Sequence, residues 1–299
     1  QSRKTFKLKM RSRTLELGER TLVMGVLNVT PDSFSDGGRY STVRAAVARA
    51  MEMEAEGADI IDIGGESTRP GSEGVSAEAE LERVLPVLLA LRGRLKIPIS
   101  IDTQKAAVAE AAIEAGAEMV NDVSALRGPE GSGRAMGEVV RRAGVPIVLM
   151  HMRGKPKTMQ RRPFARDVMG DVTKGLREAL GRARRAGIPR GRVILDPGIG
   201  FGKSTEQNCE LLARLGELKR LGCPLLIGAS RKTFIGKLLG GASEEKRAWG
   251  TAAAVTAAVL GGAQIVRVHD VGEMAQVVRV AEEIRKEMRG RRQRNRQIE

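Results

Sequence analysis

The sequence predicts an α/β fold, a (β/α)8 TIM barrel with a short N-terminal β-hairpin. Eight short runs rich in β-branched residues alternate with longer amphipathic or alanine-rich segments along the chain. These runs are apolar on both faces, which is typical of parallel strands covered by helices. Several longer segments end in a glycine followed directly by the next run, as in residues 56–62 and 260–266, because glycine closes a helix at little steric cost. A doubly wound open sheet is the structural alternative.

The first predicted elements, in chain order, form the floor of the barrel. Residues 15–17 and 21–23, joined by a turn at Gly18 and Glu19, are expected to pair as a hairpin that plugs this floor. The barrel strands are predicted at residues 21–27, 59–63, 98–101, 119–122, 145–150, 193–196, 225–227 and 265–268. The helices are predicted at residues 43–56, 77–91, 105–115, 134–143, 168–186, 206–215, 243–260 and 272–288.

Length and composition favour one domain. With 299 residues, of which 41% are hydrophobic, the chain can bury a core of normal size. No linker is apparent, so a single domain is expected over residues 1–288, and the basic run 289–299 is expected to be a disordered tail. The longest mostly apolar stretch, residues 252–266, is shorter than the roughly 18 residues that a membrane span needs. Because the charged N-terminus also lacks an apolar region, a cytoplasmic protein with no membrane segment is expected.

The strong positive charge raises nucleic acid as a partner. The formal net charge is +15, but the only dense basic run lies at residues 289–296. Aromatic residues make up just 2% of the chain, too few for the stacking platforms of single-strand binders. No specific nucleic acid is therefore expected. Cys209 and Cys223 form no ligand-like pair and are expected to be reduced thiols without a structural role.

Polar side chains follow nearly every predicted strand. In a parallel barrel the carboxyl ends of the strands meet on one face, where active sites form. A single such residue is commonly a helix cap or a loop contact, but polar residues after all eight strands together predict an active site. They are Asn28, residues 66–69, Asp102, Asn121 with Asp122, His151, Asp196, residues 230–232, and Arg267 with His269.

Three of these residues suit a flat heterocycle. Asp102, Asn121 and Asp196 offer acceptors and an amide from neighbouring strands, which match a ring edge of N–H donors and mixed acceptors. Lys232 adds a cation for a ring carbonyl or nitrogen, and an ion pair with a nearby carboxylate is its alternative role. The sequence therefore predicts a polar-edged pocket for a planar ligand.

The last strand suggests a phosphate site. Arg267 and His269 flank Val268, so both are expected to point the same way and to grip phosphate oxygens together. A core histidine is the alternative for His269. Asn28 is a poor ligand for zinc and a fair one for Mg²⁺, which takes its other oxygens from substrate phosphates and water. With no pair of carboxylates beside it, Mg²⁺ is expected to arrive with a pyrophosphate.

Two motifs are rejected on their spacing. Residues 198–204 end like a Walker A loop, but Pro197 stands where the first glycine is required, and the run also fails as GxGxxG. The glycines instead predict a flexible wall on which Phe201 offers an apolar face. Ser230 has no histidine within reach in the sequence, so a catalytic triad is not expected.

These residues fall in strings that resemble the dihydropteroate synthases, from about Thr14 to Met288. The longest string is MGVLNVTPDSFSDGG at residues 24–38. The others are GGESTRPG (64–71), SIDT (100–103), VNDVS (120–124), LMHM (149–152), LDPGIGFGK (195–203), GASRK (228–232) and RVHDV (267–271). A fifteen-residue string of this composition is not a chance match.

The resemblance implies a transferase of folate biosynthesis that joins 6-hydroxymethyl-7,8-dihydropterin pyrophosphate to p-aminobenzoate, depends on Mg²⁺, forms a homodimer and is a sulfonamide target. It assigns the catalytic role to Asp102, Lys232, Arg267 and His269. The pterin contacts it implies are Asp102, Asn121, Asp196, Lys232, Met150 and Phe201. The pyrophosphate contacts are Asn28, Thr68, Arg69, Arg267 and His269, with Asn28 also the metal ligand. The p-aminobenzoate contacts are Phe34, Asp36, Thr68, Pro70, Phe201 and Ser230.

The mechanism that the resemblance suggests is dissociative. Pyrophosphate leaves with the help of Mg²⁺, Arg267 and His269, and Asp102 stabilises the cation that develops on the pterin methylene. The alternatives are a pterin-dependent methyltransferase of the same superfamily, which should lack the phosphate grip, and a basic nucleic-acid-binding protein. A catalytically inactive paralogue is a third.

Overall fold

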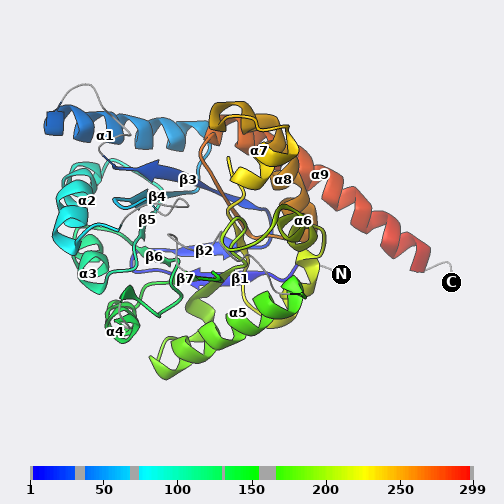
Figure 1. Cartoon of the computed structure of the whole chain (residues 1–299), viewed down its shortest axis with the longest axis horizontal. Coiled ribbons are helices and arrows are strands. Elements are labelled where there is room, and N and C mark those ends of the chain that lie inside the picture. The colour runs from blue at the N-terminus through cyan, green and yellow to red at the C-terminus, as the bar shows by residue number, and fades with distance from the viewer. Residues whose placement is uncertain (1–2, 31–37, 68–73, 130–131, 155–165, 297–299) are drawn as a thin grey trace.

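The computed structural model describes residues 3–30, 38–67, 74–129, 132–154 and 166–296. Eight parallel strands form a barrel, in the order β8-β7-β6-β5-β4-β3-β10-β9, and a bridge between Leu195 and Leu225 closes it (Figure 1). The predicted fold class is confirmed. The barrel strands are β3 (Leu22–Asn28), β4 (Ile60–Gly64), β5 (Ile99–Asp102), β6 (Met119–Asp122), β7 (Ile147–Met150), β8 (Val193–Asp196), β9 (Leu226–Ile227) and β10 (Ile265–Val268).

Helices follow the strands and surround the barrel. They are α1 (Gly38–Glu56), α2 (Ala77–Leu91), α3 (Ala106–Glu114), α4 (Gly133–Ala143), α5 (Val168–Arg185), α6 (Thr205–Ala213), α7 (Thr233–Leu238), α8 (Ala248–Gly261) and α9 (Val271–Arg296). Short 3-10 turns lie at η3 (Arg190–Arg192), η4 (Leu215–Leu221) and η5 (Glu244–Arg247). The sequence did not predict α7, because six residues are too few to establish a helical period.

The N-terminal hairpin is present, but its pairing differs from the prediction. β1 (Phe6–Lys9) pairs with β2 (Thr14–Leu17), and a tight turn joins Met10 N to Arg13 O at 2.9 Å. The expected partner, residues 21–23, instead enters β3. The reason is that β3 is buried along its length and pairs on both sides, with β4 and β10, so it has no edge free for the hairpin.

The hairpin closes the floor of the barrel. Leu8 and Leu17 are fully buried and pack with inward-facing side chains from the barrel strands. Those barrel residues are Leu22, Met24, Ile60, Met119, Val148, Ile194, Leu226 and Ile265. Because apolar side chains fill this end, the predicted plug is confirmed, and the opposite end, where the strands finish, is left for polar residues.

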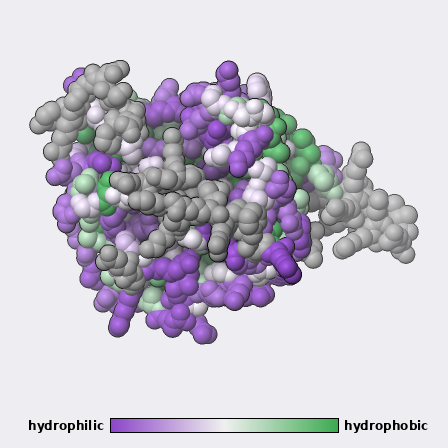
Figure 2. Space-filling view, in the orientation of Figure 1, coloured by the Kyte–Doolittle hydropathy of each residue, from purple (hydrophilic) through white to green (hydrophobic). Residues whose placement is uncertain are grey.

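The last helix runs further than the sequence predicted. The backbone of α9 continues to Arg296, beyond the predicted end of this helix at residue 288. Arginine and glutamine are good helix formers, and a single glycine at position 290 does not stop the helix. α9 projects from the body (Figure 1), and hydrophobic residues gather where it leaves the body (Figure 2). No helix in the described ranges is long and apolar enough to cross a membrane.

Candidate active site

The carboxyl ends of four strands bring charged side chains together inside the barrel mouth. Asp62 Oδ2, from β4, accepts hydrogen bonds from Arg267 Nε of β10 at 2.6 Å and from Asn121 Nδ2 of β6 at 2.9 Å. The other arm of the guanidinium, Arg267 Nη2, donates to Asp102 Oδ2 of β5 at 2.8 Å. One arginine therefore bridges two buried carboxylates across the mouth.

The sequence reasoning missed Asp62. It is the fourth residue of the run DIIDI and lies two residues before the end of β4, whose five residues are all buried. The available signal was a carboxylate at an interior position of a buried strand, because burying a charge is costly unless it has a partner. Its second oxygen, Oδ1, is buried and has no hydrogen-bond partner among the described residues. The mouth therefore holds a buried acceptor suited to a ligand N–H group.

Burial also raises the pKa values of Asp102 and Asp196, the two aspartates that the sequence predicted for the site. It raises the pKa of Asp102 to about 7, against the opposing charge of Arg267 and with a further rise from Asp62. It raises the pKa of Asp196 to about 6, although the Gly198 N–H that donates to Asp196 Oδ1 at 2.7 Å works the other way. Both groups can therefore change protonation near neutral pH.

The side chains of Asn121 and Asp122 point to opposite faces at the end of β6. Asn121 faces the network, whereas Asp122 accepts hydrogen bonds from the backbone N–H groups of Ser124 and Leu126 and from the Ser124 hydroxyl. Successive strand residues point to opposite faces, so only one of the two can reach the interior. Asp122 stabilises the following turn and is not part of the site.

The side chains of Arg267 and His269 contact different residues. Arg267 reaches across the mouth to Asp62 and Asp102, while His269 lies beside Ser230, with Nδ1 2.9 Å from its Oγ. The Ser230 hydroxyl accepts from His269 N at 3.1 Å, and we assign its own proton to Nδ1, which leaves the imidazole proton on Nε2. Burial, followed by the charge of Arg267, lowers the pKa of His269 to about 3, which keeps the ring neutral.

The Ser230–His269 contact was not expected, because no histidine lies close to Ser230 in the sequence. The two are 39 residues apart, and only the fold brings them together. The pair still lacks the carboxylate of a triad, because the adjacent Asp270 is held by Arg231 through Nε at 3.0 Å and through Nη2. Arg231 has a φ of 57°, a conformation that is strained for a residue with a side chain. This turn separates Ser230 from Lys232 within one short loop.

Lys232 lies over an apolar wall. Its Nζ is 4.0 Å from the centroid of the Phe201 ring, a cation–π contact. Phe201 packs with Met150, Met152 and Val123 in a small buried cluster. The structure thus brings together Met150 at the end of β7, Phe201 after β8 and Lys232 after β9.

Several predicted site residues lie outside the described residues. They are Phe34, Asp36, Thr68, Arg69 and Pro70. The described flanks of the 68–73 segment are joined by Glu66, whose Oε1 accepts the Val75 N–H at 2.9 Å and whose Oε2 meets Lys105 Nζ at 3.0 Å. Asn28 ends β3, beside Gly64 of β4. Within the described ranges, no three His, Cys, Asp or Glu residues form a group that could hold a metal ion.

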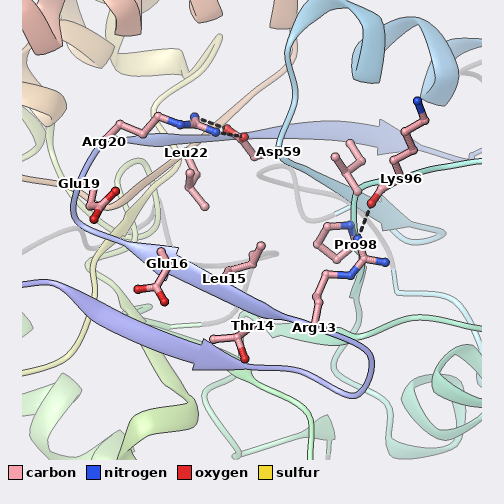
Figure 3. Close-up of a pocket in the computed structure, with 11 residues that line it drawn as sticks. Arg13, Thr14, Leu15, Glu16, Glu19, Arg20, Leu22, Asp59, Lys96 and Pro98 are labelled. Carbon is pink, nitrogen blue, oxygen red and sulfur yellow. Dashed lines mark hydrogen bonds and ion pairs between the residues drawn. The ribbon is translucent and has the colours of Figure 1, made fainter.

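A cavity of about 540 Å³ lies at the other end of the barrel, between the hairpin and the strand starts (Figure 3). Its charged side chains largely satisfy one another: Arg20 pairs with Asp59, and Arg13 donates to the Lys96 carbonyl. It lies beneath the apolar floor, away from Asp62 and Asp102. The charge network therefore marks the mouth, and not this cavity, as the candidate active site.

The comparisons agree on one kind of protein. The family model described as "Pterin binding enzyme" matches residues 24–269. The chain is 52% identical over 266 residues to the dihydropteroate synthase of Synechocystis sp., covering 89% of this chain and 90% of that protein. It is 47% identical over 260 residues to that of Escherichia coli K12, covering 87% and 90%.

Solved structures give the same result. The dihydropteroate synthase of Yersinia pestis in a sulfonamide drug complex has a TM-score of 0.87 and 44% identity, covering 94% of this chain and all (100%) of that chain. The enzyme of Xanthomonas albilineans in complex with 7,8-dihydropteroate has a TM-score of 0.82 and 44% identity, covering 93% and 98%. Both are similar in fold and in sequence over nearly the whole described barrel.

Proposed function

Because the chain belongs to the dihydropteroate synthases, we propose that its barrel mouth binds the pterin substrate through the Asp62–Arg267–Asp102 network. The enzyme condenses 6-hydroxymethyl-7,8-dihydropterin pyrophosphate with p-aminobenzoate to give 7,8-dihydropteroate and pyrophosphate. The observation that carries the proposal is the buried Asp62 Oδ1 beside this network, which has no hydrogen-bond partner in the part of the chain that the structure describes. The methyltransferase alternative has no support from the relatives, which are named dihydropteroate synthases.

The pterin ring suits the groups at the mouth. Its N–H edge would donate to the carboxylates of Asp62, Asp102 and Asp196, while Asn121, already oriented by Asp62 at 2.9 Å, would accept or donate at the same edge. Lys232 would hold a ring acceptor. The side chains of Met150 and Phe201 would line the faces of the ring and exclude water from these hydrogen bonds.

Departure of pyrophosphate needs positive groups near the methylene carbon. The guanidinium of Arg267 keeps further N–H groups beyond those given to Asp62 and Asp102, and neutral His269 carries a proton on Nε2. We assign both to the leaving phosphates. As the C–O bond breaks and cationic character develops on the methylene, Asp102 is the nearby carboxylate that stabilises it.

Mg²⁺ fits the donors present at the mouth. Asn28 supplies one neutral oxygen at the end of β3, and a magnesium ion that keeps water and phosphate ligands needs only one or two protein ligands. When bound, the ion would neutralise the leaving pyrophosphate. Asn28 is the proposed protein ligand.

The amine of p-aminobenzoate would attack the methylene from the side of Ser230 and Phe201. Phe34, Asp36, Thr68, Arg69 and Pro70 are proposed to complete this side, Thr68 and Arg69 reaching the phosphates as well. An aryl amine of low basicity needs no strong general base, so the site's task is to hold it in line. Since the Yersinia pestis enzyme forms a sulfonamide complex, we propose that sulfonamides bind here too.

We also propose that the enzyme works as a cytoplasmic homodimer. Val280, Ile284 and Met288 are exposed at four-residue spacing on α9, and Trp249, at the start of α8, is 87% exposed. α8 and α9 pack against each other, so these residues offer an apolar surface to a second copy. Free Cys209 and Cys223 suit a reducing compartment. No nucleic acid is proposed as a specific partner.

Pyrophosphate release tests the function and the metal together. Rates are measured with both substrates, with each omitted, and across a Mg²⁺ series for the wild type and for Asn28→Ala. We expect release that requires both substrates and Mg²⁺, and a variant that needs about tenfold more Mg²⁺ for half-maximal rate, since one ligand is lost. Release without p-aminobenzoate contradicts the synthase assignment. An unchanged Mg²⁺ requirement contradicts the role of Asn28.

A further inference from the structure

Lys203 lies directly behind the Phe201 wall of the barrel mouth, with its ammonium group buried. The residue is 4% exposed, and burial lowers the pKa of its ammonium group to about 7, so its charge depends on the hydrogen bonds that it makes. Its Nζ donates to the carbonyl oxygens of Gly198 at 2.9 Å and Phe201 at 3.0 Å, and it lies 3.1 Å from His151 Nδ1. All three ammonium protons therefore have acceptors, and two of those acceptors belong to one loop.

His151 anchors this ammonium to the helix layer. Burial, and next the charge of Lys203, lowers the pKa of His151 to about 2, so the ring is neutral. Nδ1 then accepts from Lys203, and the proton on Nε2 faces Asp171 Oδ2 of α5 at 3.4 Å. The ammonium is thus tied to α5 on one side and to the loop on the other.

The loop can wrap the ammonium because its turning residues are glycines. Gly198, Gly200 and Gly202 have φ values of 70°, 84° and 67°, in the left-handed region. A Cβ at Gly198 would overlap the His151 carbonyl oxygen. The same Gly198 donates its N–H to Asp196 at 2.7 Å, so the shape of the loop reaches a pterin-side carboxylate directly.

We propose that Lys203 is a positioning residue for the pterin pocket, its ammonium holding residues 197–203 in the shape that orients Asp196 and the Phe201 wall. Lys203 acts through these two residues and does not touch the substrate. The Phe201 ring in turn lies under Lys232 Nζ, at 4.0 Å. Lys203 therefore positions the carboxylate of Asp196, and through the Phe201 ring it also positions the ammonium group of Lys232. The proposal rests on the pterin pocket described above.

The test replaces the ammonium by an apolar group of similar length. Lys203→Met is compared with wild type by calorimetric titration of the pterin substrate alone, by KM for each substrate, and by circular dichroism and thermal midpoint. We expect pterin binding that is roughly 10- to 100-fold weaker, the usual scale for residues that orient a ligand-binding group. KM for p-aminobenzoate should change much less. The control, Leu8→Ala in the barrel floor, should lower the thermal midpoint and leave pterin binding unchanged.

A second variant covers the case in which Lys203→Met does not fold. His151→Ala removes one acceptor and leaves Lys203 with its two loop carbonyls, so pterin binding between that of wild type and Lys203→Met is expected. The proposal is overturned if folded Lys203→Met, or His151→Ala when the former is unfolded, binds pterin as wild type does. It is also overturned if Leu8→Ala weakens pterin binding equally. Absence of pterin binding by wild type itself would instead contradict the pterin pocket.

Discussion

At the scale of single residues, the two buried carboxyls of the mouth, Asp102 and Asp196, make the stability of the protein depend on pH. Asp102 and Asp196 have pKa values of about 7 and about 6 in the folded protein, above the ordinary 3.8. Between the ordinary pKa of 3.8 and these raised values, the folded state binds more protons than the unfolded chain. The contribution of the two carboxyls to stability is therefore present in acid and is lost as pH rises through about 6 and 7.

We therefore expect the thermal midpoint of the ligand-free protein to receive a contribution that falls from about pH 4 to about pH 7, the range between the ordinary and the raised pKa values of Asp102 and Asp196. Asp102→Asn removes the larger shift and should flatten this dependence. The midpoint is measured by calorimetry in buffers of matched ionic strength. An identical pH slope in the wild type and Asp102→Asn would show that Asp102 does not titrate in this range.

Residue chemistry could be predicted from the sequence where a polar side chain directly follows a strand, as with Asp102 and Asp196. The prediction from sequence missed Asp62, which lies inside an apolar run. It also missed the Ser230–His269 contact, which joins residues 39 positions apart. Neither failure concerns the residue types. Both concern the side of the strand and the neighbours that the closed barrel supplies, and these depend on register.

At the scale of elements, the hairpin contributes to stability and not to catalysis. Leu8 of β1 is fully buried in the floor, at the end of the barrel opposite Asp102. Leu8→Ala leaves a cavity there, and we expect a loss of about 2–5 kcal/mol in the free energy of unfolding, with KM values unchanged. Urea denaturation at equilibrium measures the loss. A large change in KM for the pterin substrate would mean that the floor and the mouth are coupled.

The strands could be located from the sequence to within about two residues because each is a short β-branched run followed by a polar residue. The hairpin pairing could not, since residues 6–9 alternate with lysine and resemble the charged terminus around them. The end of α9 was also misplaced, because a basic composition lowers the expectation of order without lowering helix propensity.

At the scale of the whole molecule, the exposed apolar residues of α8 and α9 predict self-association. Trp249→Arg introduces a charge at a side chain that is 87% exposed, so it should not disturb the fold of the monomer. We expect sedimentation equilibrium to show a dimer for the wild type and a weaker dimer, by about tenfold or more, for the variant. Matched association of both proteins would place the interface elsewhere.

The central claim is that the Asp62 network recognises the pterin, and a pair of aspartates three residues apart tests it. Asp62 lies in the mouth, whereas Asp59 pairs with Arg20 at the floor end. Calorimetric titration of the pterin substrate onto Asp62→Asn should show binding about 10- to 100-fold weaker, the loss expected for charged hydrogen bonds, while Asp59→Asn should bind as wild type does. Equal binding by wild type and Asp62→Asn would contradict the account.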